Sequence, residues 1–154
     1  METKHYFSKE NIFLDINLLN REEAFKFVAN DLLNRGFVRE DYFKGLRVRE
    51  SEFATGLHFG EYGIAIPHTD PEYIIKDFIV ILRPQNPIEF KLMIDHDETG
   101  EMNLLFFIGV VNGVDSPNVL MHLTSIMQNK KFISEILSCE DKEEMHSKII
   151  NYEG

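Results

Sequence analysis

The side chain best placed for chemistry in this sequence is a histidine that follows a short apolar run. Residues 63–68 read Gly-Ile-Ala-Ile-Pro-His, so a strand-like segment ends at Pro67 and His68 comes next. Pro67 has a fixed φ and favours extended geometry for Ile66, which would hold the imidazole in one direction. Because imidazole has an ordinary pKa near neutrality, its neutral form is available as a nucleophile at cellular pH. His68 can therefore attack a phosphoryl group in line and form a phosphohistidine.

Two arginines and a threonine upstream are candidates to support that chemistry. A planar, permanently charged guanidinium can bind the oxygens of a phosphoryl group as charge develops on them. Arg47 and Arg49 are separated by one residue, and their spacing alone does not choose between them. Charged residues on a helix usually form a solvated face. Thr55 follows where the chain is expected to leave a helix, and its hydroxyl either lines the site or satisfies the turn.

Asp70 lies two residues beyond the histidine and precedes Pro71. It is expected to cap a short helix that begins at Pro71, whose first N–H groups would stabilise an arriving phosphate. A weaker alternative is a metal-dependent hydrolase that uses His68 and Asp70. Residues 95–98 (Asp-His-Asp-Glu) lack the glycine of a calcium loop and are expected to form a solvated turn. Four further histidines are scattered without the spacing of metal ligands: His5, His58, His96 and His146.

Length and composition limit the class of protein. The 154 residues predict a single domain, 1–154, that is large enough to bury a core. With a net charge of −10 and no basic cluster, the chain is not expected to bind nucleic acid. The absence of an apolar stretch of roughly 20 residues and of a signal peptide predicts a cytoplasmic protein with no direct membrane insertion. The single cysteine, Cys139, excludes an intramolecular disulfide and a zinc-thiolate cage.

The N-terminal third is expected to be helical. Residues 21–35 form an amphipathic pattern with Asn20 as N-cap, Glu23 completing a capping box and Gly36 marking the end. Residues 39–53 are a second helical candidate with several apolar residues on one side. Both candidate arginines fall on this second helix.

The middle of the chain changes to short segments rich in Ile, Val, Phe and Leu, which are typical of strands. Residues 103–111 are apolar on both faces, which indicates a central strand covered from both sides. Pro84 and Pro87 bracket a tight connection that is expected to be a hairpin. Strands in the middle with helices before and after predict an α/β fold, a mixed β-sheet flanked by helices on both faces (an α/β/α sandwich). The expected strands are 62–66, 78–83, 88–93 and 103–111, and the later helices are 116–128, 130–138 and 141–152.

These motifs together resemble a known family. Arg49-Glu50, residues 53–57 (Phe-Ala-Thr-Gly-Leu) and residues 63–68 form a pattern similar to the enzyme IIA domain of the bacterial phosphoenolpyruvate:sugar phosphotransferase system, mannitol/fructose superfamily. With residues 82–86 (Leu-Arg-Pro-Gln-Asn), the sequence is most similar to the galactitol-type branch. The resemblance covers nearly the whole chain. The family fold, a mixed sheet flanked by helices, agrees with the predicted organisation.

The resemblance implies a role for each candidate residue. His68 matches the histidine that accepts a phosphoryl group from the phosphocarrier HPr, as a tele-phosphohistidine, and passes it to a cysteine of the cognate IIB component, the partner of a membrane IIC component. Arg49 matches the arginine that supports the phosphohistidine, and Thr55 matches a small polar position that lines the site. The implied phosphotransferase chemistry requires no cofactor and no metal. Cys139 has no phosphate-cradling loop beside it, which favours a IIA over a IIB component.

One position departs from the family pattern. Many relatives carry a second histidine at the start of the helix expected at 116–128, facing the phosphorylated ring, and the apolar pattern aligns Ser116 with it. The galactitol-type branch is similar in lacking that histidine. His122 is rotated well away from Ser116 on the same helix, so it is expected at the core edge or the surface. The group that orients the second nitrogen of His68 is left open.

The resemblance leaves two roles open. The principal hypothesis is a phosphoryl carrier in sugar or polyol uptake, and the galactitol-like details favour it. The alternative is a regulatory module whose phosphorylation state controls a partner protein. The transported molecule is selected by the membrane component and need not touch this chain, so the sequence does not identify it.

Overall fold

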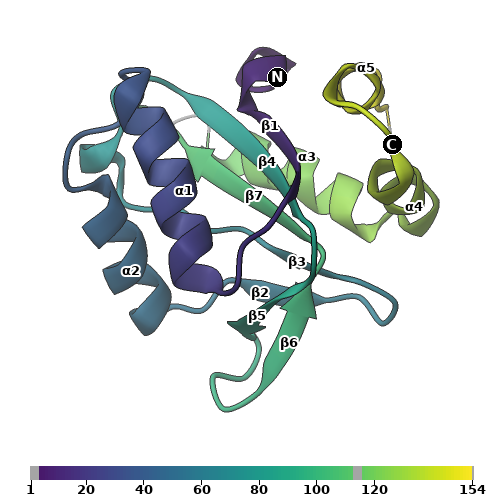
Figure 1. The fold of residues 1–154 in the computed structure, drawn as a ribbon, viewed down its shortest axis with the longest axis horizontal. Coiled ribbons are helices and arrows are strands. Elements are labelled where there is room, and N and C mark those ends of the chain that lie inside the picture. Colours follow the sequence, from purple (N-terminus) through teal and green to yellow (C-terminus); the bar gives the residue numbers. More distant parts are fainter. Residues whose placement is uncertain (1–3, 113–115, 154) are drawn as a thin grey trace.

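The core of the fold is a five-stranded mixed sheet (Figure 1). Its strands are β1 (Ile12–Ile16), β2 (Gly56–His58), β3 (Gly63–Ala65), β4 (Phe78–Pro84) and β7 (Leu104–Gly109), in the order β1-β4-β7-β3-β2. The computed structural model describes residues 4–112 and 116–153. β1 is parallel to β4 and β3 is parallel to β7, whereas the pairs β4–β7 and β2–β3 are antiparallel. β7 lies in the middle of the sheet and is buried throughout, which confirms the prediction for 103–111.

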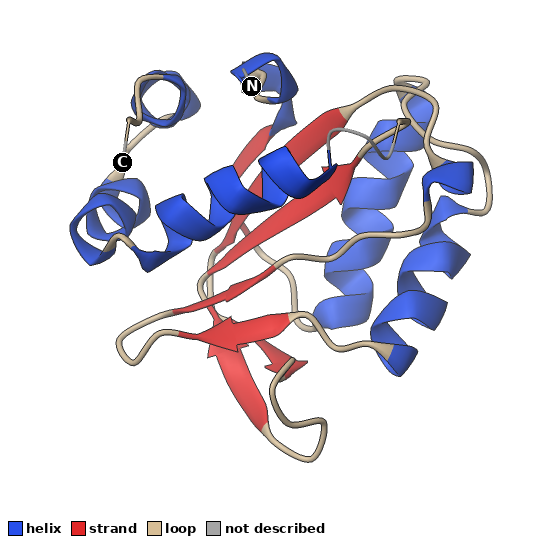
Figure 2. Cartoon of the chain, turned by 180° about the vertical axis from the view of Figure 1, so that it is seen from behind, coloured by secondary structure: helices blue, strands red, loops and turns tan. Residues whose placement is uncertain are grey.

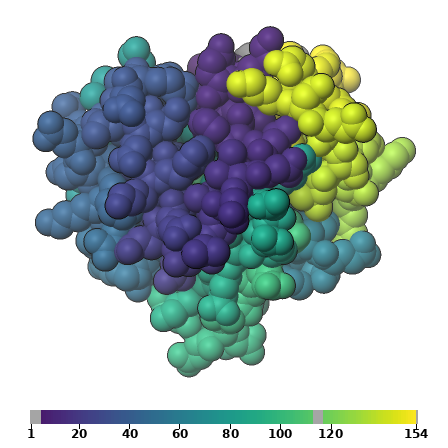
Figure 3. Space-filling model, viewed as in Figure 1, coloured from purple at the N-terminus to yellow at the C-terminus, as the bar shows by residue number. Residues whose placement is uncertain are grey.

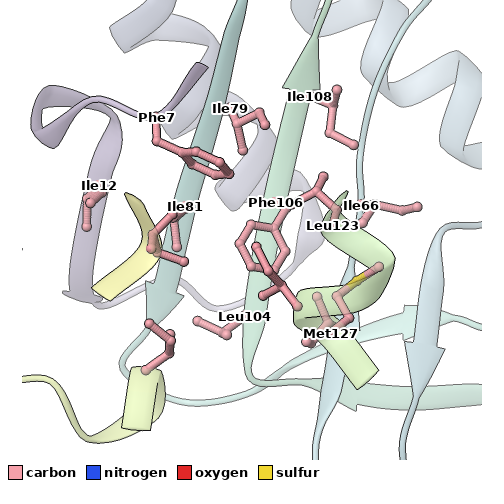
Figure 4. Close-up of a cluster of buried hydrophobic side chains, with 14 of the residues drawn as sticks. Phe7, Ile12, Ile66, Ile79, Ile81, Leu104, Phe106, Ile108, Leu123 and Met127 are labelled. Atoms are coloured by element: carbon pink, nitrogen blue, oxygen red, sulfur yellow. The ribbon is translucent and has the colours of Figure 1, made fainter. Parts of the chain in front are cut away.

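Helices cover both faces of the sheet, which confirms the predicted α/β/α sandwich (Figures 1 and 2). One face carries α1 (Arg21–Asn34) and α2 (Tyr42–Glu52), and the other carries α3 (Ser116–Gln128), α4 (Lys130–Ser138) and α5 (Lys142–Ile150). Alternate residues of β7 point to opposite faces, as the pleat of a strand requires. Phe107 packs in the cluster under α1 and α2, and Phe106 packs in the cluster under α3, together with Leu123 and Met127 (Figure 4).

Local signals explain the bounds of α1. The Asn20 side chain accepts a hydrogen bond from the Glu23 backbone N–H at 2.9 Å, as an N-cap does. The Glu23 carboxylate accepts in turn from the Leu19 N–H, one residue before the position of a standard capping box. Gly36 follows the helix with a φ of +80°, a conformation that glycine adopts at low cost. The predicted start and end of this helix are therefore confirmed.

The predicted hairpin across Pro84 and Pro87 is wrong. β4 pairs with β1 and β7 in the large sheet, whereas the next strand, β5 (Ile88–Lys91), pairs with β6 (Thr99–Met102) in a separate two-stranded sheet. All residues of β4 are buried, so it takes a central place between two partners. Two prolines indicate that the chain turns, but burial on both faces decides which strands pair.

Three strands were not indicated by the sequence: β1, β2 and β6. β2 and β6 are short and contain glycine, and β1 is interrupted by Asp15, which has a φ of 59° where the register with β4 shifts. Each lacks the uninterrupted run of β-branched and aromatic residues that marks a strand. They are strands because they pair with β4, β3 and β5, respectively.

The two ends of the described chain meet at the β1 edge of the sheet. The 3₁₀ helix η2 (Lys9–Asn11) and β1 both contact α5, and Figure 3 shows the N-terminal surface in purple against the C-terminal surface in yellow. Arg83, at the end of β4, donates to both carboxylate oxygens of Asp15 at 3.1 and 3.0 Å. It also donates to the carbonyl oxygens of Ile136 and Leu137, each at 3.2 Å. Arg83 therefore joins β1, β4 and α4.

The described helices are short or polar. Within residues 4–112 and 116–153, no helix combines the length and the apolarity needed to cross a bilayer.

Candidate functional site around His68

His68 lies just beyond the end of β3, beside β7 of the large sheet. The strand β3 ends at Ala65, and the chain continues alongside β7, where Ile108 N–H donates to the Pro67 carbonyl at 3.1 Å and His68 forms a single bridge with Ile108. The histidine is therefore held by backbone pairing beyond the end of the strand. This agrees with the rigid placement expected from residues 63–68.

One nitrogen of the His68 ring is held by the chain itself. Nδ1 lies 2.8 Å from the carbonyl oxygen of Ile66, and the side chain is half-buried. A carbonyl oxygen only accepts hydrogen bonds, so Nδ1 carries the hydrogen and the neutral ring has its lone pair on Nε2. The Ile66 carbonyl thus answers the question of what orients the second nitrogen in this chain.

The surroundings keep the ring neutral. Burial lowers the pKa of His68 below its ordinary value, and the charge of Arg49 lowers it further. The hydrogen bond to Ile66 and the carboxylate of Asp70 raise the same pKa but do not outweigh the burial. At neutral pH the Nε2 atom is therefore available as a nucleophile.

The structure separates the two candidate arginines. Arg47 Nε lies 3.0 Å from the Glu22 carboxylate, so its guanidinium is paired with α1. The charge of Arg49 lowers the pKa of His68. One guanidinium nitrogen of Arg49 lies 3.4 Å from the Asp70 carboxylate, and its guanidinium carbon lies 4.8 Å from the centre of the Phe53 ring. The Arg49 Nε atom is buried and finds no hydrogen-bond partner among the described residues.

Thr55 joins the site through its backbone. Its carbonyl oxygen accepts a hydrogen bond from Ile66 N–H at 3.3 Å, and Ile66 lies two residues before His68. Its hydroxyl donates to Glu50 Oε1 and its N–H donates to Glu50 Oε2, both at 2.8 Å. The hydroxyl is thus engaged by a buried carboxylate.

The capping role expected for Asp70 is wrong. Asp70 occupies the N-cap position of η3 (Pro71–Tyr73), a three-residue 3₁₀ helix, but its side chain makes no capping hydrogen bond. The carboxylate faces the Arg49 guanidinium instead, since an opposite charge attracts it more strongly than the end of so short a helix. The negative group beside His68 is therefore part of an ion pair.

Two side chains near the site were given no role by the sequence. Glu50, next to Arg49 in the chain, is 5% exposed and binds Thr55, and its position in the Arg-Glu pair was the only signal. His96, in the turn after β5, accepts a hydrogen bond from Ala54 N–H through Nε2 at 3.1 Å. The segment 95–98 is exposed, as expected of a turn, but it also contacts the chain that leads into β2.

The remaining candidates lie away from this site. His122 is half-buried between the rings of Phe7 and Tyr152, with ring centres 6.0 Å from each, which confirms the core-edge prediction. α3 begins at Ser116, whose side chain lies outside the described residues. Cys139 is buried at the end of α4, where burial raises the pKa of its thiol.

The described residues contain no group of three or more His, Cys, Asp and Glu side chains that could hold a metal ion. A neutral histidine with a free Nε2, beside an arginine with an unused donor, instead suits a protein that carries a phosphoryl group.

Comparison with known proteins agrees with this class. A family model described as phosphoenolpyruvate-dependent sugar phosphotransferase system, EIIA 2, matches residues 5–152, and the chain belongs to this family. It is therefore a phosphoryl-carrier component of a sugar phosphotransferase system.

Individual relatives extend the comparison. The galactitol-specific EIIA component of Escherichia coli K12 is 27% identical over 130 residues, which cover 83% of this chain and 86% of that protein. The mannitol-specific EIICBA component of Vibrio cholerae is 33% identical over 141 residues, which cover 84% of this chain and 21% of that protein. Among solved structures, the complex of enzyme IIAMTL with phosphorylated enzyme IIBMTL from Escherichia coli matches with a TM-score of 0.76 and 22% identity, covering 95% of this chain and 98% of the solved one.

Proposed function

We propose that His68 accepts a phosphoryl group at Nε2 from the phosphocarrier HPr and passes it to a cysteine of the cognate IIB component. The observation that carries the proposal is the hydrogen bond from His68 Nδ1 to the Ile66 carbonyl. It leaves Nε2 with the lone pair and a fixed direction, which are the two requirements for in-line attack.

The two transfers balance without a metal. In the first, the Nε2 lone pair forms a bond to phosphorus while the bond between phosphorus and the donor breaks, and that electron pair stays with the donor. In the second, a IIB thiolate attacks the phosphorus and the electron pair of the Nε2–P bond returns to the His68 ring. Throughout, the Ile66 carbonyl holds the hydrogen on Nδ1 and stabilises the positive charge that develops on the ring.

Arg49 is proposed to stabilise the moving phosphoryl group. Its contact with Asp70 is long and the Asp70 side chain is 64% exposed, so the guanidinium can exchange this partner for phosphate oxygens. A buried Nε without a partner in the described chain is a second donor that the free protein does not use. Thr55 is assigned to the site because its carbonyl accepts the Ile66 N–H, while its hydroxyl donates to Glu50.

The relatives support IIB as the partner and a sugar or polyol as the transported molecule. One solved relative is a complex with phosphorylated enzyme IIB, and one curated relative combines IIC, IIB and IIA in its name. The galactitol-specific EIIA component supports a galactitol-like polyol. Phe53, 59% exposed and packed on Arg49, offers an apolar contact for a docking protein beside the site. These names favour transport over the regulatory alternative.

The direct test is phosphorylation in vitro. We expect that phosphoenolpyruvate, enzyme I and HPr add one acid-labile phosphate to the protein, that His68→Ala abolishes it and that the exposed control His5→Ala does not. A IIB component from the same organism provides the second test, because phosphate should pass from His68 to the cognate IIB. Unimpaired labelling of His68→Ala would overturn the proposal, and labelling without transfer to IIB would favour the regulatory alternative.

A further inference from the structure

The transfer described above makes no use of Glu50, although this carboxylate is 5% exposed and lies beside the site. We propose that Glu50 is a positioning residue, which fixes the tautomer and direction of the His68 ring through Thr55 and Ile66. The inference rests on the proposed function of His68.

The first link is a two-point contact between Glu50 and Thr55. One carboxylate oxygen accepts the Thr55 N–H and the other accepts the Thr55 hydroxyl, both at 2.8 Å. A buried carboxylate requires donors, and these two bonds fix both the backbone and the side chain of Thr55. Burial raises the pKa of Glu50, while Thr55, Arg21 and His96 act in the opposite direction.

The second link continues the pairing of β2 with β3. Gly56 is paired with Ala65, and the next pair outward is joined by the bond from Ile66 N–H to the Thr55 carbonyl at 3.3 Å. The contact of Glu50 with Thr55 therefore supports one further backbone pair beyond the last residue pair of β2 and β3. The partner of Thr55 in that pair is Ile66, whose N–H is thereby held, and its carbonyl lies one α-carbon further along the chain.

The third link is the bond from the Ile66 carbonyl to His68 Nδ1 at 2.8 Å. The backbone before Thr55 is also held by a side chain, because Ala54 N–H donates to His96 Nε2. A change of Glu50 removes the acceptor of one or both Thr55 donors, and we expect the effect to extend to the Ile66 carbonyl that selects the tautomer. A purely structural Glu50 would stabilise the end of α2 without affecting the ring.

Nitrogen-15 NMR of the His68 ring separates these roles in the full chain. Glu50→Gln keeps the size of the side chain but leaves an acceptor for only one Thr55 donor, and Thr55→Val removes the hydroxyl. We expect both variants to lose part of the Nδ1–H tautomer and to accept phosphate from phosphorylated HPr about tenfold more slowly. Thr55→Ser, which retains the hydroxyl, should restore both readouts. Glu52→Gln, on the exposed end of the same helix, is the matched control.

The outcomes decide between the inferences. Glu50→Gln and Thr55→Val proteins that unfold more easily but keep the wild-type tautomer and rate would overturn the positioning role. If Glu50→Gln does not fold, the comparison of Thr55→Val with Thr55→Ser gives the same decision. Failure of the wild-type protein to be phosphorylated at His68 would instead refute the proposed function, and the tautomer measurement would still test the positioning.

Discussion

Two arginines of this protein use their guanidinium groups in opposite ways. Arg83 is 8% exposed and donates to Asp15 and to two backbone carbonyls at the end of α4. Arg49 is half-buried, makes one contact of 3.4 Å with Asp70, and leaves Nε without a partner among the described residues. The first arginine is committed to joining three elements of the fold. The second retains donors for a group that arrives from outside.

The contrast between Arg83 and Arg49 distinguishes a structural charge from a functional one. A buried charge is tolerated when its nitrogens are paired, as all three nitrogens of Arg83 are. A preorganised donor left unpaired reduces the stability of the free protein but strengthens binding to charge that develops during a reaction. We therefore expect changes at Arg83 to affect unfolding and changes at Arg49 to affect phosphoryl transfer.

The largest effect is expected from Arg49→Gln. Removal of the charge should slow phosphoryl acceptance by roughly 10²–10³-fold, as the loss of one preorganised donor does in other enzymes. The free energy of unfolding should stay within about 0.5 kcal/mol of wild type, since the Arg49–Asp70 pair is long and partly exposed and such a pair contributes little. Rates with phosphorylated HPr and urea titrations measure the two quantities. Arg47→Gln is the control for both, and a normal transfer rate in Arg49→Gln would contradict the assignment.

The next effect is expected from Arg83→Met, which keeps the apolar stem and removes the donors. The free energy of unfolding should fall by about 2–3 kcal/mol, because two carbonyls near the end of α4 lose a donor and Asp15 loses its partner. The loss stays moderate because Asp15 is 62% exposed and can be hydrated. Urea unfolding measures it, and Asp15→Asn should show a smaller loss. Slower phosphoryl transfer in a folded Arg83→Met protein would contradict the purely structural role of Arg83.

A smaller effect concerns pH. The pKa of His68 is lowered by burial and by Arg49, so acceptance of phosphate should be constant through neutral pH and fall only below the ordinary value of 6.5. A histidine kept neutral in the fold contributes stability that is lost as pH decreases below its unfolded pKa. Arg49→Gln should raise the pKa of His68 and move the acidic decline to higher pH. An NMR titration of the ring would refute this if the pKa stayed unchanged.

The smallest effect is expected from Tyr42→Phe. The Tyr42 hydroxyl is buried without a partner among the described residues, and burial raises its pKa strongly. Because an unpaired buried hydroxyl costs free energy, its removal should be neutral or stabilising by up to about 1 kcal/mol, with unchanged transfer. Urea unfolding of the variant measures this. Unchanged transfer would show that the unpaired Tyr42 hydroxyl, unlike Arg49, has no part in the reaction. A clear loss of stability would contradict this expectation.

Much of the fold was predictable because its signals are local. The cap at Asn20, the glycine after α1 and the apolar run of β7 each depend on residues within a few positions of one another. The incorrect hairpin and the missed β1, β2 and β6 have a different origin. Their identity depends on which distant strand lies beside them, and a proline or glycine in a short segment gives no information about that.

The candidate site was predictable to the same extent. His68 follows from its own segment, since Pro67 and the apolar run before it place a histidine at a strand end. The roles of Arg49, Asp70 and Glu50 relative to one another were not predictable from spacing. Asp70 was expected to cap a helix and instead faces Arg49, because a tertiary contact with a full charge outweighs a three-residue helix end.

The order of the amino acids was sufficient to predict the α/β architecture and one histidine suited to phosphoryl transfer, because the hydrophobic period, the turns and the residue types are properties of short segments. The tertiary structure pairs the Arg47 guanidinium with Glu22 and the Arg49 guanidinium with Asp70, and it alone shows that the Ile66 carbonyl holds Nδ1 of His68. It also decided that Glu50 clamps Thr55. These contacts depend on distances between separate elements, and such distances exist only once the sheet and its helices have packed.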